Sequence, residues 1–331
     1  MTPAWGAVSG YIGAMTTQGP PVAASNSPVG DDGRSRGVAV VGSANLDFVF
    51  GTERIPLPGE TLLALSADRF PGGKGLNQAV AAARSGASTA FIAALGRDEN
   101  GGLLAETITA AGIDDTLVRR VDEATGQAFI VVNRAGENTI IVAGGANLGM
   151  VALTVADRAA LAASSVVLMQ LELPMSIVSE AAAVAHAAGT IVMLNAAPSR
   201  KLPEELLRAL DYLIVNEHEA CQIGGSDELE AASLALAALV PRVVVTVGAA
   251  GSVLYEAGTE AARIPAPRVT PVDTVGAGDT FCGAFAAAIA EGQGFEDAAR
   301  FATAAAALSV QAVGAVPSIP ERARIEEALA R

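Results

Sequence analysis

An aspartate at the start of an apolar stretch is the residue best placed in this sequence to do chemistry. The segment 268–292, RVTPVDTVGAGDTFCGAFAAAIAEG, puts Asp279 directly after Gly276, Ala277 and Gly278. Small residues at a helix start let the first amides point at one position, which attracts an anion such as a phosphoryl group. A carboxylate there could accept the proton of a hydroxyl that attacks phosphorus. The alternative is that Asp279 caps the helix.

A glycine-rich segment places a lysine and an amide at the start of another expected helix. In residues 70–86, FPGGKGLNQAVAAARSG, Gly73 is followed by Lys74 and then by Asn77. The lysine offers hydrogen-bond donors, and Asn77 adds an amide at the same end. A plain glycine-rich loop without a ligand is the alternative.

A third segment, GSANLD at 42–47, ends the first expected strand and carries Asn45 and Asp47. Open α/β sheets bind their ligands at the carboxyl ends of the strands. Each of these side chains could therefore hydrogen-bond a substrate hydroxyl. An Asx turn is the alternative.

The common phosphate-binding loops do not fit these segments. A Walker loop needs glycine at position 68 and Ser or Thr at position 75, where this chain has Asp68 and Gly75. The first strand is not followed by G-x-G-x-x-G, and the later G-x-G has Phe281 at the third glycine position. Both ordinary nucleotide loops are therefore excluded.

The composition narrows the class of protein. The chain has 331 residues, is 51% hydrophobic and carries a formal net charge of -14, which argues against a broad basic face for nucleic acid. No apolar run approaches the roughly 18 residues of a membrane span. Cys221, Cys282, His186 and His218 lie without metal-binding spacing, so reduced thiols in a cytoplasmic protein are expected. The chemistry must then rest on carboxylates, amides and backbone groups.

The elements that would position these residues alternate along the chain. Strand patterns occupy 37–42, 88–95, 164–171, 190–197, 211–216 and 242–248, and helical patterns occupy 76–86, 100–112, 175–189 and 229–239. Continuously apolar strands that alternate with helices predict an α/β fold with a mainly parallel sheet covered on both faces.

Two segments depart from this alternation. Residues 47–70 and 126–145 each have the pattern of two strands joined by a turn, with Gly136 in the second turn. We expect a small β-sheet outside the main one, with strands from about 46–70 and 126–143, which would act as a lid or an oligomer surface.

Residues 1–36 differ from the rest of the chain. They are rich in Gly, Ser, Pro and Thr without a sustained period, so we expect a disordered extension before a domain at 37–331. A basic start followed by an apolar core is missing, so the segment does not match a signal peptide.

The order of six motifs adds a resemblance. GSANLD, GGKGLNQAVAAARSGA, QLELP, VNEHEA, VTVGAAGS and DTVGAGDTFCGAF follow one another within the region from about Gly37 to the C-terminus. In this order they closely resemble the ribokinase-like PfkB family of sugar and nucleoside kinases, to which GGKGxNQA and DTxGAGDTFxG are specific. The resemblance implies a three-layer sandwich with a small β lid.

The resemblance also implies roles for the residues singled out above. Asp279 would deprotonate the sugar's primary hydroxyl, while the amides of Gly276, Ala277 and Gly278 hold the charge that builds on the transferred phosphoryl group. The implied sugar site consists of Asn45, Asp47, Gly73, Lys74, Asn77 and Glu172, with Asp279 at the reacting end. Glu172 follows an expected strand, and a surface acid is the alternative for it.

On the nucleotide side the resemblance points to Asn216 and Glu219, which would organise Mg²⁺ and the phosphates of ATP, partly through water. The alternative for this pair is an ordinary helix start. The other implied nucleotide contacts are Thr246, Gly248, Gly251, Gly278 and Thr303. Thr303 stands where the family often has Asn or His.

A monovalent cation site beside the anion site is implied as well. It would use mostly carbonyl oxygens and bind K⁺. The residues implied are Asp273, Val275, Val310, Val313, Ala315 and Ser318.

The expected reaction is ATP-dependent phosphorylation of D-ribose at its 5-hydroxyl. A homodimer through the lid strands is expected. The alternatives are a kinase of the same family for 2-deoxyribose, fructose or adenosine, or a sugar-binding protein without catalysis. The small aromatic content, 4% of residues, makes stacking on a nucleoside base less favoured.

Overall fold

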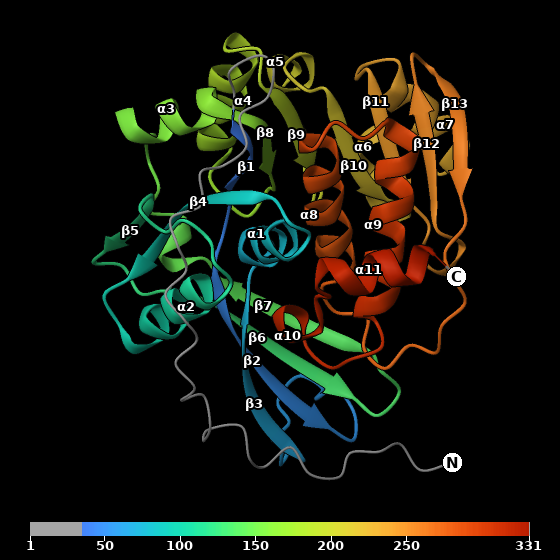
Figure 1. Ribbon diagram of the computed structural model, residues 1–331. Helices are drawn as coiled ribbons and strands as arrows, with labels where there is room; N and C mark the ends of the chain where they lie inside the picture. The colour runs from blue at the N-terminus through green and yellow to red at the C-terminus, as the bar shows by residue number, and fades with distance from the viewer. Residues whose placement is uncertain (1–34, 331) are drawn as a thin grey trace.

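The computed structural model describes residues 35–330, which form a large sheet between two helical layers and a small sheet beside one end of them (Figure 1). The strands of the large sheet are β1 (Ser35–Val41), β4 (Ser88–Gly96), β5 (Val118–Val121), β8 (Ser164–Met169), β9 (Ile191–Asn195), β10 (Tyr212–Asn216), β11 (Arg242–Thr246), β12 (Ser252–Glu256) and β13 (Thr259–Ile264). The small sheet contains β2 (Asn45–Thr52), β3 (Ser66–Gly72), β6 (Gly126–Asn133) and β7 (Asn138–Ala143).

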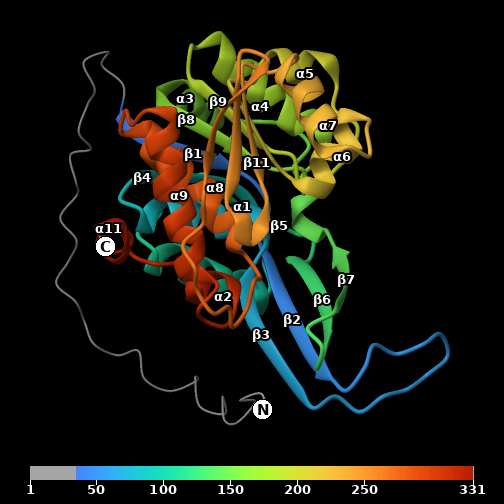
Figure 2. The same ribbon diagram turned by 90° about the vertical axis from the view of Figure 1, so that its right-hand side faces the viewer.

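The helices cover both faces of the large sheet (Figure 2). They are α1 (Lys74–Arg84), α2 (Glu99–Ala110), α3 (Val155–Ala163), α4 (Met175–Ala187), α5 (Glu204–Arg208), α6 (Glu217–Gly224), α7 (Leu229–Ala237), α8 (Ala277–Ala290), α9 (Phe295–Ser309), α10 (Ala315–Ser318) and α11 (Arg322–Leu329), with short 3-10 helices η1 (Gly145–Asn147) and η2 (Gly248–Ala250). One core cluster draws on α1, α2, α8, α9 and α11, and the other on α3 to α7.

The large sheet is mainly parallel, which confirms the predicted fold class. Its strand order is β13-β12-β11-β10-β9-β8-β1-β4-β5, and only the β11–β12 and β12–β13 pairs are antiparallel. Val38 and Val40 of β1 belong to one core cluster, whereas Ala39 and Val41 belong to the other. A strand buried on both faces must be apolar at every position, which is why the strand segments lack alternation.

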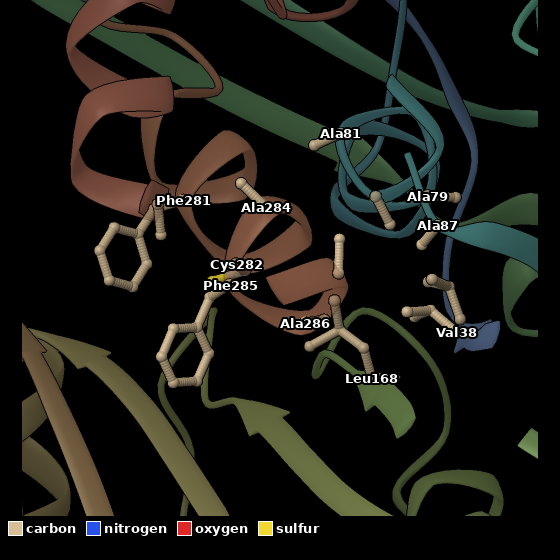
Figure 3. Packing of buried hydrophobic residues seen from close by; sticks show 14 of the residues in the cluster. Val38, Ala79, Ala81, Ala87, Leu168, Phe281, Cys282, Ala284, Phe285 and Ala286 are labelled. Atoms are coloured by element: carbon tan, nitrogen blue, oxygen red, sulfur yellow. The ribbon is translucent and has the colours of Figure 1, made fainter. Parts of the chain in front are cut away.

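Helices α1 and α8 pack closely because small residues line their contact (Figure 3). A Cβ atom added to Gly283 would lie 2.3 Å from the Gln78 carbonyl oxygen and 2.5 Å from the Ala81 Cβ. Any side chain at Gly283 would therefore push the two helices apart. The alanine-rich sequences of both helices serve this approach, which holds their N-terminal ends together.

The small sheet has the strand order β3-β2-β6-β7. Strands β6 and β7 form the expected hairpin, and Gly136 in its turn has a φ of 83°. Phe48 and Phe129 stack across the sheet with ring centroids 5.4 Å apart. All six residues of β7 are exposed, among them Ile140, Ile141 and Val142.

The sequence did not anticipate every element. Strand β1 begins at Ser35, two residues before the boundary expected for the domain, and residues 1–34 of the expected extension lie outside the described residues. Strands β5, β12 and β13 have no counterpart among the segments predicted from the apolar runs. None of the helices within residues 35–330 is long and apolar enough to cross a membrane.

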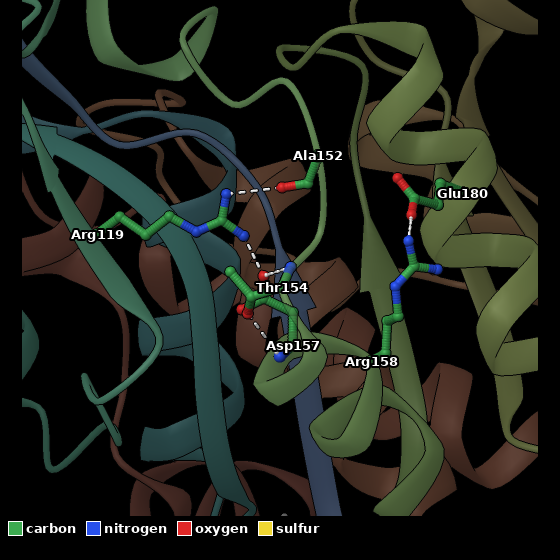
Figure 4. A network of polar contacts seen from close by, with 6 residues as sticks. All are labelled: Arg119, Ala152, Thr154, Asp157, Arg158 and Glu180. Carbon is green, nitrogen blue, oxygen red and sulfur yellow. Dashed lines mark hydrogen bonds and ion pairs between the residues drawn. The ribbon is translucent and has the colours of Figure 1, made fainter.

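A polar network joins β5 to the start of α3 (Figure 4). Arg119 pairs with Asp157 and donates to the Ala152 carbonyl at 2.8 Å. Asp157 also accepts from the Thr154 amide at 2.6 Å, and the Thr154 hydroxyl accepts from the Asp157 amide at 3.1 Å. This reciprocal capping box fixes the start of α3.

Candidate active site

The polar residues of the sequence motifs gather at one edge of the large sheet. The segment GSANLD at 42–47 follows β1, and Glu172 follows β8. Asn216 ends β10, and Thr246 ends β11. Asn216 and Thr246 are also direct partners in the strand register. Because the carboxyl ends of parallel strands share an edge, these segments far apart in sequence meet there.

Asp279 is the third residue of helix α8 and does not cap it. The N-cap is Gly276, with a φ of 76° and no side-chain hydrogen bond to the helix start. The two carboxylate oxygens of Asp279 accept instead from Asn77 Nδ2 and Gln78 Nε2, each at 2.9 Å. The interpretation of Asp279 as a helix cap is therefore wrong.

The start of α8 has backbone positions where only glycine or another small residue fits. A Cβ atom at Gly276 would lie 2.8 Å from the Ala315 Cβ, so this position combines a left-handed backbone with close packing. Ala277 and Gly278 provide the first amides of the helix. Amides of a first helical turn have no acceptor within the helix, so they favour an anion at this end.

Glu172 and Asn45 are fixed by hydrogen bonds. Glu172 Oε2 accepts from the Ser43 hydroxyl at 2.5 Å and from the Lys74 amide at 3.1 Å. Asn45 Oδ1 accepts from Asn147 Nδ2 at 2.8 Å. These contacts join the loop after β1 to the start of α1, to the loop after β8 and to η1.

Glycines allow Asp47 and the Asn45 backbone to approach α1. A Cβ atom at Gly72 would lie 2.1 Å from an Asp47 carboxylate oxygen, and one at Gly73 would lie 2.7 Å from the Asn45 amide nitrogen. Gly73 also has a φ of 88°, which favours glycine. The glycine-rich segment is thus more than a flexible loop, because its backbone packs directly on the polar residues after β1.

Burial and neighbouring charges distinguish the ionisable groups. Burial, followed by the charges of Glu172 and Asp279, raises the pKa of Asp47 to about 7. The charge of Asp279 is the largest influence on Lys74 and raises its pKa, although burial opposes this effect. Lys74 therefore stays cationic among the carboxylates, while Asp47 titrates near neutral pH.

One buried acceptor in this region lacks a protein partner. Asn77 is 5% exposed, and within the described part of the chain no group donates to its Oδ1 atom. A buried amide oxygen normally accepts a hydrogen bond. The arrangement can therefore bind a ligand that carries a hydroxyl beside Asp279.

Asn216 and Glu219 form a capping box at the start of α6. Asn216 Oδ1 accepts from the Glu219 amide at 2.8 Å, and Glu219 Oε2 accepts from the Asn216 amide at 2.9 Å. Burial raises the pKa of Glu219. The helix-start interpretation is confirmed for this pair, and it leaves Glu219 Oε1 outside the box.

The other predicted nucleotide residues differ in their surroundings. Gly248 begins η2 and Gly251 follows it, with φ values of 54° and 102°, and the Thr246 hydroxyl donates to the Val215 carbonyl at 3.4 Å. The Thr303 hydroxyl donates to the Ala299 carbonyl of its own helix at 2.7 Å, and the residue is 5% exposed. Thr303 is thus turned into α9 rather than offered to a ligand.

The two segments expected to bind a cation meet. Asp273 accepts from the amides of Val275 at 3.0 Å and Gly314 at 2.9 Å. The Val310 carbonyl already accepts from the amides of Val272 at 2.7 Å and Asp273 at 3.2 Å. The Ala315 carbonyl accepts from the Ser318 hydroxyl at 2.8 Å, and Val313 is exposed.

Several residues of this region were missed in the sequence analysis. They are Ser43, Gln78, Asn147, Gln170 and Asn195. Ser43, Gln78 and Gln170 lie inside the motifs themselves, and Asn195 lies in an expected strand segment. Polar residues within otherwise buried segments were the available signal, because a buried amide requires partners.

Comparisons with known proteins agree with this architecture. A family model described as pfkB family carbohydrate kinase matches residues 35–322. The chain is 41% identical over 293 residues to the ribokinase of Haemophilus influenzae, a match that covers 86% of this chain and 95% of that protein. It is 39% identical over 298 residues to the bifunctional ribokinase/ribose-5-phosphate isomerase A of Fructilactobacillus sanfranciscensis, covering 87% of this chain and 55% of that longer protein.

A solved structure is similar over nearly its whole length. The structure of Arabidopsis thaliana ribokinase complexed with ribose and ATP has a TM-score of 0.83 and 37% sequence identity, covering 89% of this chain and 99% of that one. These matches confirm the resemblance found in the sequence motifs. The chain belongs to the pfkB family of carbohydrate kinases.

Proposed function

We propose that this protein transfers the γ-phosphoryl group of ATP to the 5-hydroxyl of D-ribose, giving D-ribose 5-phosphate and ADP. The observation that carries the proposal is the carboxylate of Asp279, held by Asn77 and Gln78 beside the uncapped start of α8. Relatives named ribokinase at about 40% identity, and a similar structure that holds ribose and ATP, support the choice of sugar and nucleotide.

In the proposed reaction, Asp279 accepts the proton of the 5-hydroxyl while the hydroxyl oxygen forms a bond to the γ-phosphorus. The bond between that phosphorus and the β,γ-bridging oxygen breaks, and ADP leaves with the electron pair. The amides of Gly276, Ala277 and Gly278 stabilise the charge on the transferred group, and of these the Ala277 amide also donates to the Thr274 carbonyl at 3.3 Å.

The other hydroxyls of the sugar bind to the carboxylates and amides around the start of α1. Asn45, Asp47 and Glu172 accept from hydroxyls, and the unpartnered Oδ1 of Asn77 takes one more. Gly73 allows the backbone approach, and Lys74 balances the negative charge of Asp279 and Glu172. A neutral polyol suits this set, because each group can hold a hydroxyl without a charged partner on the ligand.

The phosphates and magnesium of Mg-ATP bind on the α6 side, near Asn216, Glu219, Thr246, Gly248 and Gly251. Glu219 fits an indirect role toward Mg²⁺, because one carboxylate oxygen is left outside the capping box. Among residues 35–330, no cluster of three His, Cys, Asp or Glu side chains could hold a metal, which suits an ion that keeps most of its water. When bound, Mg²⁺ neutralises phosphate charge.

A K⁺ site between Asp273 and residues 310–318 is part of the proposal. The two segments are joined by the hydrogen bond from the Gly314 amide to Asp273, and the carbonyl oxygens of Val275, Val313 and Ala315 are the proposed ligands, although that of Ala315 also accepts from the Ser318 hydroxyl. Val310 fits least well, because its carbonyl already accepts two amide hydrogen bonds. A cation there would add positive charge near the start of α8.

The small sheet acts as a lid and as the surface for a homodimer. Its exposed strand β7 presents Ile140, Ile141 and Val142, which a second copy would cover. Lid closure would exclude water, so that the sugar rather than solvent receives the phosphoryl group. Location in the cytoplasm fits the net charge and the substrates.

The test measures ADP release in a coupled assay with Mg-ATP and D-ribose, 2-deoxyribose, fructose, adenosine or fructose 6-phosphate, each with and without K⁺. We expect the highest kcat/KM for D-ribose and a further increase with K⁺. Preference for another acceptor would overturn the substrate, and absence of turnover with all five would overturn the proposed activity. Analytical ultracentrifugation of Ile141→Asp against wild type tests the dimer, since loss of a dimer is expected.

A further inference from the structure

A buried glutamine beside the candidate base is the starting point. Gln78 of α1 and Gln170, just after β8, are both fully buried, and Asn195 of β9 is 8% exposed. Burying three side-chain amides is costly unless they are hydrogen-bonded, so their presence next to Asp279 requires a reason. Nothing in the proposed binding of sugar or ATP uses Gln78, Gln170 or Asn195.

The direction of the hydrogen bonds in this cluster is fixed by a backbone carbonyl. The Ile214 carbonyl can only accept, and it accepts from Asn195 Nδ2 at 3.2 Å. Asn195 therefore presents its Oδ1 atom to Gln78 Nε2, at 3.1 Å. The amino group of Gln78 must then face Asn195 Oδ1, and its second hydrogen is donated to Asp279 Oδ1 at 2.9 Å.

A second contact holds Gln78 from its other side. Gln170 Nε2 donates to Gln78 Oε1 at 2.6 Å. A flipped Gln78 would face both Asn195 Oδ1 and Asp279 Oδ1 with its carbonyl oxygen, so these two hydrogen bonds would become acceptor–acceptor contacts. The large sheet thus determines which atom Asp279 meets.

We infer that Gln78, oriented by Asn195 and contacted by Gln170, is a positioning residue that aligns the carboxylate of Asp279 to accept the proton of the substrate hydroxyl. A fixed N–H donor matches a carboxylate oxygen but not the O–H of a protonated acid. The inference rests on the proposed kinase function and adds to it a residue that touches the base rather than the sugar.

Other charges also act on Asp279 and must be separated from Gln78. Lys74 of α1 is a cation that interacts with it, while the carboxyl groups of Asp47 after β1, Glu172 after β8 and Glu219 of α6 influence the same region. Cys282, one turn along α8, is buried and its pKa is raised well above the usual value by burial, so it is neutral. A test must therefore change Gln78 without moving these groups.

The decisive variant is Gln78→Glu, which keeps the shape and replaces the donor by an acid. Two neighbouring carboxyl groups resist ionising together, so the base would be protonated at a higher pH. We expect kcat for D-ribose to fall about 100-fold, KM to change by less than about threefold, and the pH of half-maximal kcat to rise by about one unit. Gln222→Glu, an exposed glutamine on α6, is the matched control and should change none of these.

Two further variants keep the inference testable if Gln78→Glu folds poorly. Gln78→Met removes the donor without adding charge, and Asn195→Leu removes the acceptor that orients Gln78. Each should lower kcat about tenfold with little change in KM, and the thermal midpoint of each shows whether the protein is folded. Folded variants with wild-type kcat and pH profile would overturn the inference. Wild-type protein inactive on every acceptor would instead overturn the proposed function.

Discussion

Helices α6 and α8 both begin at the edge of the sheet where the site lies, and both carry an acid as their third residue. In α6 that acid, Glu219, reaches back to the Asn216 amide and closes a capping box. In α8 the acid, Asp279, makes no such contact, since the N-cap Gly276 offers no side chain and Asp279 is held by α1. An acid at the third position of a helix thus caps its own helix in α6, whereas in α8 it is held by another helix.

The difference shows how a helix start can be used. The capping box of α6, like that of α3, satisfies amides within the chain and stabilises the helix. The start of α8 has no side-chain cap, its Ala277 amide donates to the Thr274 carbonyl at 3.3 Å, and its acid is held by α1.

The largest effect on kcat should come from removing the carboxylate of Asp279, the acid that does not cap its helix. We expect Asp279→Asn to lower kcat about 1,000-fold or more, because the amide cannot accept the hydroxyl proton. The dissociation constant for D-ribose, measured by calorimetry, should change by less than about tenfold. Glu219→Gln provides the same neutralisation at α6, and near-normal turnover by Asp279→Asn would contradict the assigned role.

A smaller loss is expected when the uncapped start is distorted. Gly276→Ala introduces strain at a φ of 76° and a contact 2.8 Å from the Ala315 Cβ, so kcat should fall about 10- to 100-fold. Gly225→Ala is the matched control, since this residue has a φ of 72° at the other end of α6 with open space around it. Equal kcat losses in the two variants would mean that strain alone is responsible.

Asp47 extends the comparison to an acid on a strand, where no helix amides stabilise its charge. Its pKa is raised from 3.8 to about 7, so its ionisation in the folded protein costs stability as the pH rises through that range. Asp47→Asn should raise KM for D-ribose about tenfold. The difference in free energy of unfolding, Asp47→Asn minus wild type, should increase by on the order of 2 kcal/mol between pH 5 and pH 8.

Urea unfolding of both proteins at the two pH values measures this change. No pH dependence in the difference would show that Asp47 is ionised throughout the range. A stabilised variant with wild-type KM would instead remove Asp47 from the sugar site.

At α6, charge and capping can be separated. Glutamine also completes a capping box, so Glu219→Gln should keep the thermal midpoint within a few degrees. We expect the Mg²⁺ concentration for half-maximal activity to rise about fivefold, because the negative charge is lost. An unchanged Mg²⁺ requirement would reduce Glu219 to a structural role.

The smallest effect should follow loss of the cap itself. Asn216→Ala should lower the free energy of unfolding by about 1 kcal/mol. Thr154→Ala removes the equivalent cap at α3, whose hydrogen bonds involve none of the site residues, and should cost a similar amount without any change in KM for ATP. A rise in KM for ATP in Asn216→Ala alone would add nucleotide binding to its capping role.

Local sequence determined much of this protein. The apolar segments specified most strands of the parallel sheet, because burial on both faces requires an apolar residue at each position. The segments around Gly73 and Gly276 marked the starts of α1 and α8, since their positive φ values favour glycine. Asp279, Lys74, Asn45 and Asp47 could be selected because each follows such a turn or strand end.

Only the tertiary structure decided which hydrogen-bond partners the buried polar side chains have. Whether an acid at the third position of a helix closes a cap depends on the packing around it, and the donors to Asp279 come from α1, about 200 residues earlier in the chain. Gln78, Gln170 and Asn195 gain their partners only when β8, β9 and β10 lie side by side. Hydrogen bonds between distant segments leave no local spacing, so only the folded sheet could reveal which buried amides hold the base.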